Sequence, residues 1–112
     1  VHIADLDAFS RKYRYFWFSY WGAFVDIRVE DHLNAAVGQA AVSILWSDGS
    51  TDQCTTDSSG WCRIAGYQFA GTPQLILTVT GVGHATWPYE PSLNRDPEND
   101  SDGTRITVQS PL

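Results

Sequence analysis

Apolar and polar residues alternate along several segments of the chain, with the period of two that is typical of β-strands. The clearest segment is residues 21–30. One side of it is apolar and is predicted to face the core: Trp21, Ala23, Val25, Ile27 and Val29. The other side carries Asp26, Arg28 and Glu30 and is predicted to face solvent.

The same alternation predicts further strands. They lie at residues 1–8, 40–46, 51–55, 61–65, 74–82 and 104–109, with predicted turns at 10–14, 31–39 and 47–50. In three of these strands, one apolar side is again predicted to face the core: Ala40, Val42, Ile44, Trp46, Leu75, Leu77, Val79, Ile106 and Val108. No segment has a helical period. About seven short strands separated by turn signals predict an all-β chain, a single immunoglobulin-like antiparallel β-sandwich domain over residues 1–112.

An aromatic run precedes the clearest strand. If the alternation is traced backward from Trp21, then Tyr15, Trp17 and Ser19 are predicted on the core side. The remaining aromatic residues then fall on the solvent side: Phe16, Phe18, Tyr20 and Phe24. A bulge at Ser19 or Gly22 would exchange the two sides.

Four aromatic residues on the solvent side of one strand form an apolar patch of the kind that usually marks a contact surface. Three interpretations are open. Another segment of the domain, such as the loop near Trp87, covers the patch. A neighbouring domain or subunit packs on it. A ligand such as a sugar stacks on its rings.

Composition and charge exclude several classes of protein. The chain is 43% hydrophobic and 18% charged, which is typical of a globular domain and not of a disordered one. Its net charge is −6 and it holds a single lysine, whereas a nucleic-acid binder needs clustered basic residues. No apolar run approaches the length of about 20 residues that a membrane helix needs.

The two cysteines are predicted to form a disulfide. Cys54 and Cys62 flank a turn-forming run, and the arms of a short hairpin lie close enough to be bridged. The alternative is a pair of buried free thiols. A disulfide indicates an oxidising compartment, so we expect the protein to be secreted or at the cell surface.

No arrangement of residues in the sequence indicates catalysis, and we expect no enzyme activity. There is no Gly-x-Ser-x-Gly elbow, and the three histidines are scattered along the chain. A metal site is the stronger chemical hypothesis, because carboxylates alternate in the segment before the last strand and such oxygen ligands favour Ca²⁺. The candidate ligands are Asp96, Glu98, Asp100 and Asp102. The alternative is a solvated Asp-Gly turn that opens the last strand.

A resemblance to a known family rests on two motifs. They are Asp31-x-x-Asn34-x-x-Val37-x-x-Ala40-x-Val42 and Cys54-Thr55-Thr56-Asp57-x-x-Gly60-x-Cys62. Together they resemble bacterial immunoglobulin-like domains of invasin-type adhesins and the C-terminal modules of secreted proteases and glycosidases. Ile3-Ala4-Asp5-Leu6-Asp7 and Asp100-Ser101-Asp102-Gly103-Thr104 fit the modules of secreted enzymes best. The resemblance implies a β-sandwich, an extracellular location and no catalysis. The aromatic run from Tyr15 to Trp21 departs from it.

Two functions are therefore expected. The first is a non-catalytic accessory module, cut from a larger secreted bacterial protein, that acts as a spacer, stabiliser or docking surface. Its partner would be a neighbouring domain of the same polypeptide, an extracellular protein or a polysaccharide. The second is a carbohydrate-binding module, with or without a structural calcium. Its candidate ligand-binding residues are Phe16, Phe18, Tyr20, Phe24, Trp61 and Trp87.

Overall fold

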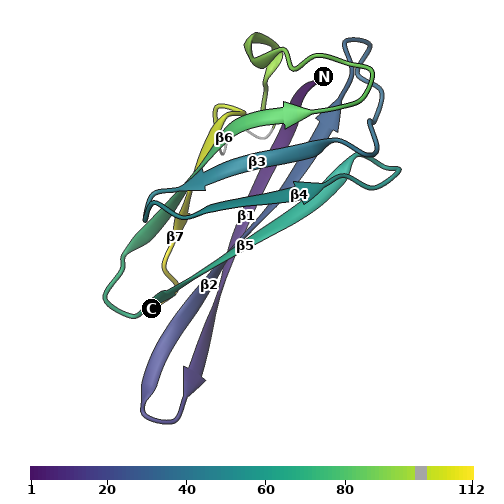
Figure 1. Ribbon diagram of the computed structural model, residues 1–112. Helices are drawn as coiled ribbons and strands as arrows, with labels where there is room; N and C mark the ends of the chain where they lie inside the picture. The colour runs from purple at the N-terminus through teal and green to yellow at the C-terminus, as the bar shows by residue number, and fades with distance from the viewer. Residues whose placement is uncertain (98–100) are drawn as a thin grey trace.

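The computed structural model describes residues 1–97 and 101–112. Within these residues the chain forms seven strands and one short 3-10 helix. The strands are β1 (His2–Tyr15), β2 (Phe18–Glu30), β3 (Ala41–Trp46), β4 (Thr51–Thr55), β5 (Trp61–Phe69), β6 (Gln74–Gly83) and β7 (Arg105–Gln109), and the helix is η1 (Pro91–Leu93). The predicted all-β class is confirmed (Figure 1).

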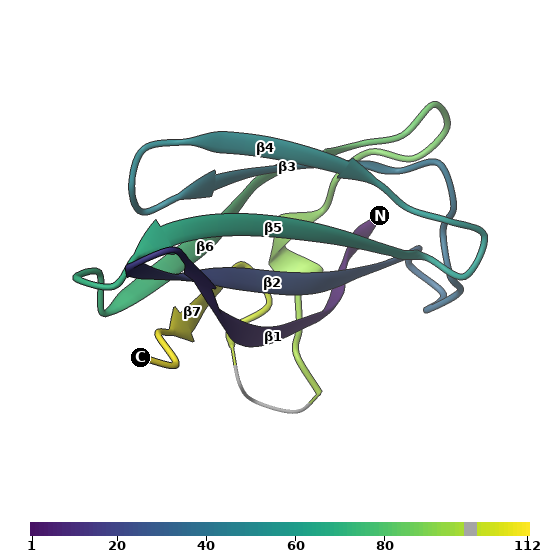
Figure 2. The same ribbon diagram turned by 90° about the horizontal axis from the view of Figure 1, so that it is seen from below.

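The strands form two antiparallel sheets that pack face to face, as the view from below shows (Figure 2). One sheet has the strand order β1-β2-β5 and the other has the order β4-β3-β6-β7. In a constant-type immunoglobulin domain the fourth strand lies in the same sheet as the first, second and fifth. Here β4 pairs with β3 instead, so the fourth strand belongs to the opposite layer.

The core lies between the sheets and is built from the apolar sides that the sequence predicts. The inward residues of β2, including Trp21 and Val25, are fully buried, and those of β3, β6 and β7 are buried as well. Gly66 of β5 gives Trp46 its space: a Cβ at residue 66 would lie 2.9 Å from Cε2 of the Trp46 indole. The indole therefore packs directly against the backbone of the opposite sheet.

The first hairpin is longer than predicted. Residues 10–14, predicted as a turn, form the second half of β1, which pairs with β2 from His2↔Glu30 to Tyr15↔Phe18. The turn is instead the dipeptide Phe16–Trp17. The turn prediction is wrong because residues 10–14 contain no Gly, Pro, Asn or Asp, while Tyr13 and the neighbouring Phe9 and Tyr15 are good strand formers.

The predicted core side of Tyr15 and Trp17 is also wrong. Tyr15 is 56% exposed and Trp17 is 86% exposed. Two causes act together. The turn interrupts the alternation, so Tyr15 shares the face of its partner Phe18. In addition, β5 ends at Phe69 opposite Tyr20, so the hairpin continues past the last strand that could flank it (Figure 1).

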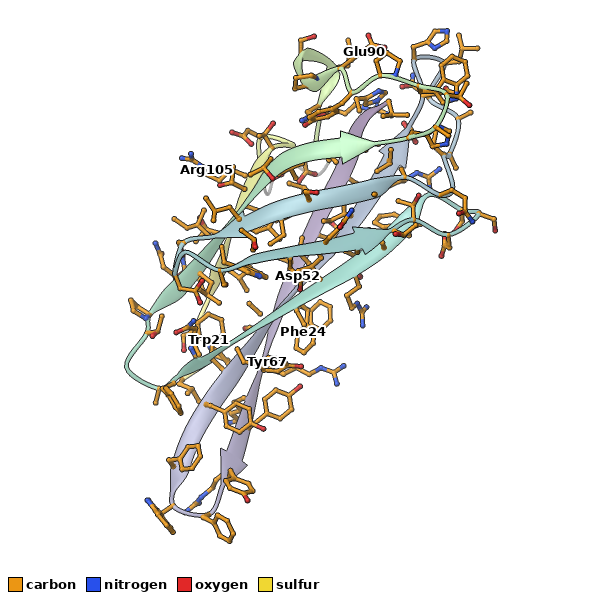
Figure 3. All side chains as sticks on the ribbon, viewed as in Figure 1. Trp21, Phe24, Asp52, Tyr67, Glu90 and Arg105 are labelled. Atoms are coloured by element: carbon orange, nitrogen blue, oxygen red, sulfur yellow. A yellow bond between two sulfur atoms is a disulfide. The ribbon has the colours of Figure 1, made fainter. Side chains whose placement is uncertain are left out.

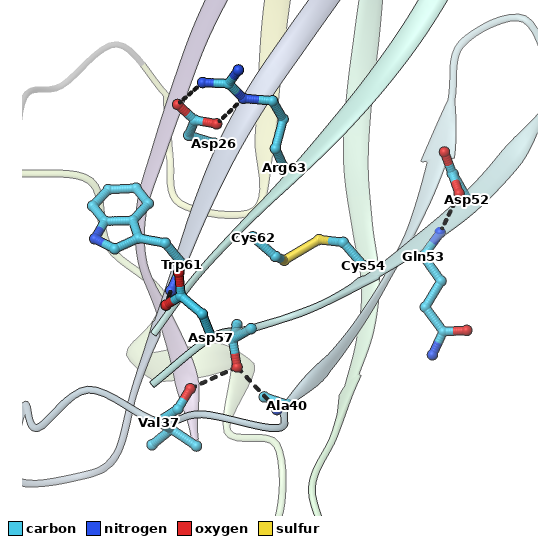
Figure 4. Close-up of a disulfide and its surroundings, with 11 residues drawn as sticks. Asp26, Val37, Ala40, Asp52, Gln53, Cys54, Asp57, Trp61, Cys62 and Arg63 are labelled. Atoms are coloured by element: carbon cyan, nitrogen blue, oxygen red, sulfur yellow. Dashed lines mark hydrogen bonds and ion pairs between the residues drawn. A yellow bond between two sulfur atoms is a disulfide. The ribbon is translucent and has the colours of Figure 1, made fainter. Parts of the chain in front are cut away.

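The disulfide between Cys54 and Cys62 is confirmed, and the chain has no free cysteine. Its two arms pair with different neighbours: Cys54 of β4 lies opposite Val42 of β3, and Cys62 of β5 lies opposite Ile27 of β2. The bridge therefore connects the edge strand of one sheet to the edge strand of the other (Figure 4). The segment predicted as a hairpin is therefore a connection between the two sheets: β4 and β5 do not pair with each other, and the disulfide links them.

The segment after β6 holds the start of β1 in place. The N-terminal amino group donates to the carbonyl of Pro88 (2.6 Å), and the backbone N–H of Arg95 donates to the carbonyl of Ile3 (3.0 Å). Oδ1 of Asn94 accepts from the N–H of Ile3 (2.8 Å), while Nδ2 donates to the hydroxyl of Tyr89 (2.6 Å). This long loop is thus a structural cover for the N-terminal end of the sandwich.

Candidate functional site: an aromatic platform on the first sheet

Aromatic side chains gather on the outer face of the sheet β1-β2-β5, opposite to the core. Cross-strand partners share a face, so the register of β1, β2 and β5 places them on one surface. We call this surface the aromatic platform, and it consists of Phe9, Tyr13, Tyr15, Phe18, Tyr20, Phe24, Tyr67 and Phe69. Figure 3 shows Phe24 and Tyr67 on the side of the sheet away from Trp21.

The rings of β1 and β2 meet in pairs. Phe9 and Phe24 stack with their centroids 5.0 Å apart, and Tyr13 and Tyr20 stack at 5.1 Å. Such pairs contribute about 0.5–1.5 kcal/mol beyond the burial of their area. The platform is therefore ordered by its own contacts before any partner binds to it.

The third strand joins these pairs into a continuous surface. Tyr67 meets Phe24 edge to face at 6.1 Å, and Phe69 meets Phe18 in the same way at 6.0 Å. Gly22 lies beneath the first contact: a Cβ there would be 2.9 Å from Cε2 of Phe24 and 3.0 Å from Cε1 of Tyr67. The missing side chain allows the two rings to close over β2.

Much of the platform remains open to solvent. Tyr67 is 57% exposed and Phe69 is 69% exposed. At their end of the sheet the surface is hollowed by a shallow groove of about 490 Å³. The groove is lined by Tyr15, Phe18, Tyr20, Tyr67, Gln68 and Phe69. Within the patch predicted from the sequence, Phe16 is 70% and Phe18 37% exposed, whereas Tyr20 and Phe24 are half-buried beside rings of the same sheet. The interpretation in which another described segment covers the patch is therefore wrong for Phe16 and Phe18.

Charged residues border the platform at the end away from the hairpin turn. The guanidinium of Arg63 forms two hydrogen bonds with the carboxylate of Asp26, at 2.6 and 3.1 Å. The hydrogen bonds from Arg63 to Asp26 raise the pKa of Arg63 further above its usual value. The same guanidinium lies 5.0 Å from the ring centroid of Phe9. We call Asp26 and Arg63 the charged row. They add hydrogen-bonding groups to the border of the apolar surface.

The candidate binding residues from the sequence fall into four places. Phe18, Tyr20 and Phe24 lie on the platform, and Phe16 lies in the hairpin turn beside it. Trp61 is on the same face of the sheet but beyond the charged row, beneath the guanidinium of Arg28 at 5.7 Å.

Trp87 lies away from the platform, since its ring contacts His32 with the centroids 5.7 Å apart. His32 belongs to the turn after β2, at the opposite end of that strand from the hairpin. The structure therefore does not bring Trp87 to the other candidates. Trp61 is half-buried and Trp87 is exposed, and the two do not belong to one binding surface.

Sequence reasoning missed part of the platform. The missed members are Phe9, Tyr13, Tyr15, Tyr67 and Phe69. Their signal was present, because aromatic residues recur at every second or fourth position in 9–15 and in 67–69. The predicted turn at residues 10–14 and the predicted end of the fifth strand at residue 65 concealed it.

The calcium hypothesis is tested only in part, because Glu98 and Asp100 lie outside the described residues. Asp96 is buried and accepts a hydrogen bond from the hydroxyl of Ser101 (2.6 Å). Oδ1 of Asp102 accepts from the backbone N–H groups of Thr104 (2.8 Å) and Arg105 (2.7 Å), and these bonds lower its pKa. Asp102 thus caps the entry into β7, and a calcium site in this segment stays a prediction.

Charged groups also meet at the start of β1, where the carboxylate of Glu30 accepts hydrogen bonds from Arg28 (3.0 Å) and Arg95 (2.8 Å). Within residues 1–97 and 101–112 no three His, Cys, Asp or Glu side chains lie together as metal ligands would. His2 is buried at the start of β1, where desolvation lowers its pKa, and its Nδ1 has no hydrogen-bond partner. The charges of Glu30 and Arg95 act on this imidazole in opposite directions, and its desolvation is the largest effect on its pKa.

Comparison with known proteins does not identify the chain: no family model, no curated protein and no solved structure matches it. No helix in the described residues is long and apolar enough to cross a bilayer.

Proposed function

We propose that this chain is a non-catalytic accessory immunoglobulin-like module of a secreted bacterial protein, and that the aromatic platform is its docking surface. The exposure of the platform carries the proposal, since no described segment packs over it. Monomeric proteins rarely leave a large contiguous apolar patch without a partner. The disulfide supports an extracellular location, because such bonds persist in oxidising compartments.

A simple spacer would not need this surface. An antiparallel sheet with one solvated face normally alternates apolar residues toward the core with polar residues toward water. Here β2 obeys this rule at Asp26 and Arg28 and breaks it at Phe18, Tyr20 and Phe24. The change from a polar to an aromatic outer face within one strand favours a docking role over a spacer role.

The proposal is tested by comparing the isolated chain with the secreted protein that contains it. Hydroxyl-radical footprinting measures how accessible Tyr67 and Phe69 are in each. We expect both residues to be protected in the full protein, while the exposed Leu45 on the other sheet reacts equally in both. Equal oxidation of Tyr67 and Phe69 in the two samples would remove docking onto a neighbouring domain.

A second candidate function is carbohydrate binding, and the groove favours it. Ligand sites are concave, have volumes of roughly 300–1,000 Å³, and combine aromatic walls with a few polar groups. The groove of about 490 Å³ is lined by aromatic side chains, and three of them, Tyr15, Tyr20 and Tyr67, carry a hydroxyl group. Rings and hydroxyls together match a sugar, which has apolar C–H faces and a polar rim.

Binding of soluble polysaccharides, measured by calorimetry, tests this second function. Removal of an anchoring aromatic side chain usually weakens binding by about tenfold or more. We expect Tyr67→Ala and Phe69→Ala to have this effect, and Leu45→Ala to have none. A polysaccharide that binds all three variants as well as the native chain would place its site elsewhere.

A further inference from the structure

The β1–β2 hairpin forms a projecting arm with an apolar end. We call residues 11–20 the hairpin arm; they extend past most of the other strands at the bottom of Figure 1. The turn displays Phe16, 70% exposed, and Trp17, which is more exposed still. Tyr15 and Phe18 flank them. The aromatic end is thus accessible from several directions, unlike the flat platform behind it.

Basic residues lie directly behind this aromatic end. Arg11, Lys12 and Arg14 are all exposed. Arg11 lies on the platform face of β1, whereas Lys12 and Arg14 lie on the other face, so the positive charge surrounds the arm. We call these three residues the basic collar.

The charge of the arm is opposite to that of the rest of the molecule. Residues 8–25 contain three of the seven basic residues and none of the thirteen acidic ones. They are therefore +3 in a chain whose net charge is −6, and the remaining residues sum to −9. An anionic surface would attract the arm and repel the body of the domain, which orients the molecule with its turn toward that surface.

We propose that the hairpin arm inserts its aromatic end into the interface of an anionic lipid bilayer, with the basic collar at the lipid headgroups. Trp and Tyr concentrate at the membrane–water interface because their rings are amphipathic. Peripheral proteins bury apolar side chains to a depth of about 5–10 Å and need electrostatic attraction as a second signal. The arm supplies both signals within ten residues of sequence.

The geometry of the strand agrees with that depth. A strand rises about 3.4 Å per residue. Arg14 and Lys12, two and four residues before Phe16, therefore lie roughly 7 and 14 Å behind it along the arm. When the turn enters the bilayer interface, these two cations reach the level of the phosphates. Their long side chains can adjust to that level because the aliphatic stems tolerate apolar surroundings.

Two observations favour a membrane over a protein partner at this end of the molecule. A stable protein interface takes roughly 20–30 residues from each partner, whereas the end of the arm is one turn closed by the pair Tyr15 and Phe18. In addition, Phe16 has φ 54°, a backbone region that favours glycine, so a bulky ring is displayed there against conformational preference. A fluid lipid surface accepts such a ring without a complementary pocket.

This inference does not depend on what the aromatic platform binds. The groove shares Tyr15, Phe18 and Tyr20 with the hairpin arm, but neither Phe16 nor Trp17 lines it, and its walls Tyr67 and Phe69 belong to β5. Footprinting and polysaccharide binding test the platform without lipid. Either proposal can therefore fail while the other stands.

Sedimentation with lipid vesicles tests the proposal. We expect the full chain to bind vesicles of phosphatidylcholine mixed with phosphatidylglycerol, to bind phosphatidylcholine alone weakly, and to be released by salt. A Phe16→Ser/Trp17→Ser variant should lose binding. An Arg11→Gln/Lys12→Gln/Arg14→Gln variant should weaken it roughly 100-fold, because each basic residue near an anionic surface contributes about a fivefold gain.

The matched control is Leu33→Ser, which removes an apolar side chain, 75% exposed, from the turn after β2. It should bind vesicles as the native chain does. Circular dichroism melting confirms that each variant is folded, and the salt dependence of the native chain replaces the charge variant if that variant unfolds. Absence of vesicle binding, equal binding of the serine variant, or a native dimer that the same serine variant dissociates would overturn the proposal.

Discussion

Gly66 and Trp46 meet across the core, and their fit depends on the absence of a single methyl group. The indole of Trp46 is buried, so it cannot turn away to make room for a larger residue at position 66. Inserting a carbon into a packed core usually costs about 1–3 kcal/mol. We expect Gly66→Ala to lower the free energy of unfolding by this amount, measured from the midpoint of urea unfolding.

Gly71→Ala is the control for that measurement, because a Cβ at residue 71 would meet nothing within 4 Å. Its unfolding midpoint should stay within the range of ordinary surface substitutions, about 0.5 kcal/mol. If both alanine variants are equally stable, the contact between β5 and the Trp46 indole is looser than the structure indicates.

Four aspartates make the stability of the fold sensitive to acid. Hydrogen bonds lower the pKa of each carboxylate below the ordinary value of 3.8. Backbone N–H groups are the main donors to two of them, Ala35 to Asp31 and Thr104 to Asp102. Serine hydroxyls are the main donors to the other two, Ser50 to Asp48 and Ser59 to Asp57. A lower pKa in the folded state means that the unfolded state binds more protons below 3.8. The stability that these four hydrogen-bonded carboxylates contribute is therefore complete above pH 3.8. It is lost as the pH falls through their pKa values in the folded state.

We expect the melting temperature to decrease as the pH is lowered from about 5 to about 2.5. An Asp31→Asn/Asp57→Asn variant keeps a side-chain oxygen that can accept the same hydrogen bonds but cannot titrate. Its melting temperature should fall less steeply than that of the native chain over this range. Parallel curves would show that these two carboxylates do not contribute to acid sensitivity.

At the scale of elements, the disulfide holds together two edge strands that do not pair with each other. Loss of a bridge across eight positions of sequence is expected to cost about 2–3 kcal/mol in the chain-entropy model. A Cys54→Ala/Cys62→Ala variant should lose this free energy in urea unfolding, without leaving a free thiol. The hydroxyl of Thr56 still bonds to Val37 (2.7 Å) and Ala40 (3.0 Å), so the connection between the two sheets should itself remain folded.

A reducing agent provides the control for the bridge. It should lower the melting temperature of the native chain and leave that of the double alanine variant unchanged. A variant as stable as the oxidised native chain would mean that the packing between β4 and β5 suffices without the covalent link.

The first hairpin carries a conformational cost in its turn. Phe16 has φ 54°, and a side chain in this region costs roughly 1–2 kcal/mol relative to glycine. We expect Phe16→Gly to raise the free energy of unfolding by about 1 kcal/mol. Trp17→Gly is the control: the φ of Trp17 is not positive, so no such gain is expected there. A loss of stability in Phe16→Gly would show that ring contacts to Tyr15, at 4.4 Å, outweigh the strain.

At the scale of the whole molecule, a sandwich and a projecting arm share one pair of strands. The molecule measures 49 Å along its long axis and 24 and 23 Å across. The core residues of β1 and β2 end at Trp21, so the remainder of the hairpin adds length without adding core. The sandwich should therefore fold without the end of the arm.

Replacing residues 13–20 by Asn-Gly tests this division. The new turn keeps Lys12 opposite Trp21 and uses the dipeptide that two-residue hairpins prefer. We expect the shortened chain to unfold in one cooperative transition and to keep its β-sheet circular dichroism, while losing the proposed vesicle binding. A molten or unfolded product would mean that the stacked rings of the arm are needed to form the first sheet.

The sequence by itself determined which residues of each strand point to the same side, and it predicted the sandwich and the disulfide. It could do so because alternation is a local property of an extended backbone and needs no knowledge of neighbouring strands. The inward sides of β2, β3, β6 and β7 were therefore predicted correctly. The candidate residues Phe18, Tyr20 and Phe24 followed from the same alternation.

Only the tertiary structure decided where that alternation restarts and which faces are covered. The turn at Phe16–Trp17 resets the phase between β1 and β2, and so placed Tyr15 beside Phe18 and not in the core. Strand pairing brought Tyr67 and Phe69 of β5 to the same surface. Exposure of a face depends on whether another sheet extends far enough to cover it, and this length is set by packing between segments that are distant in sequence.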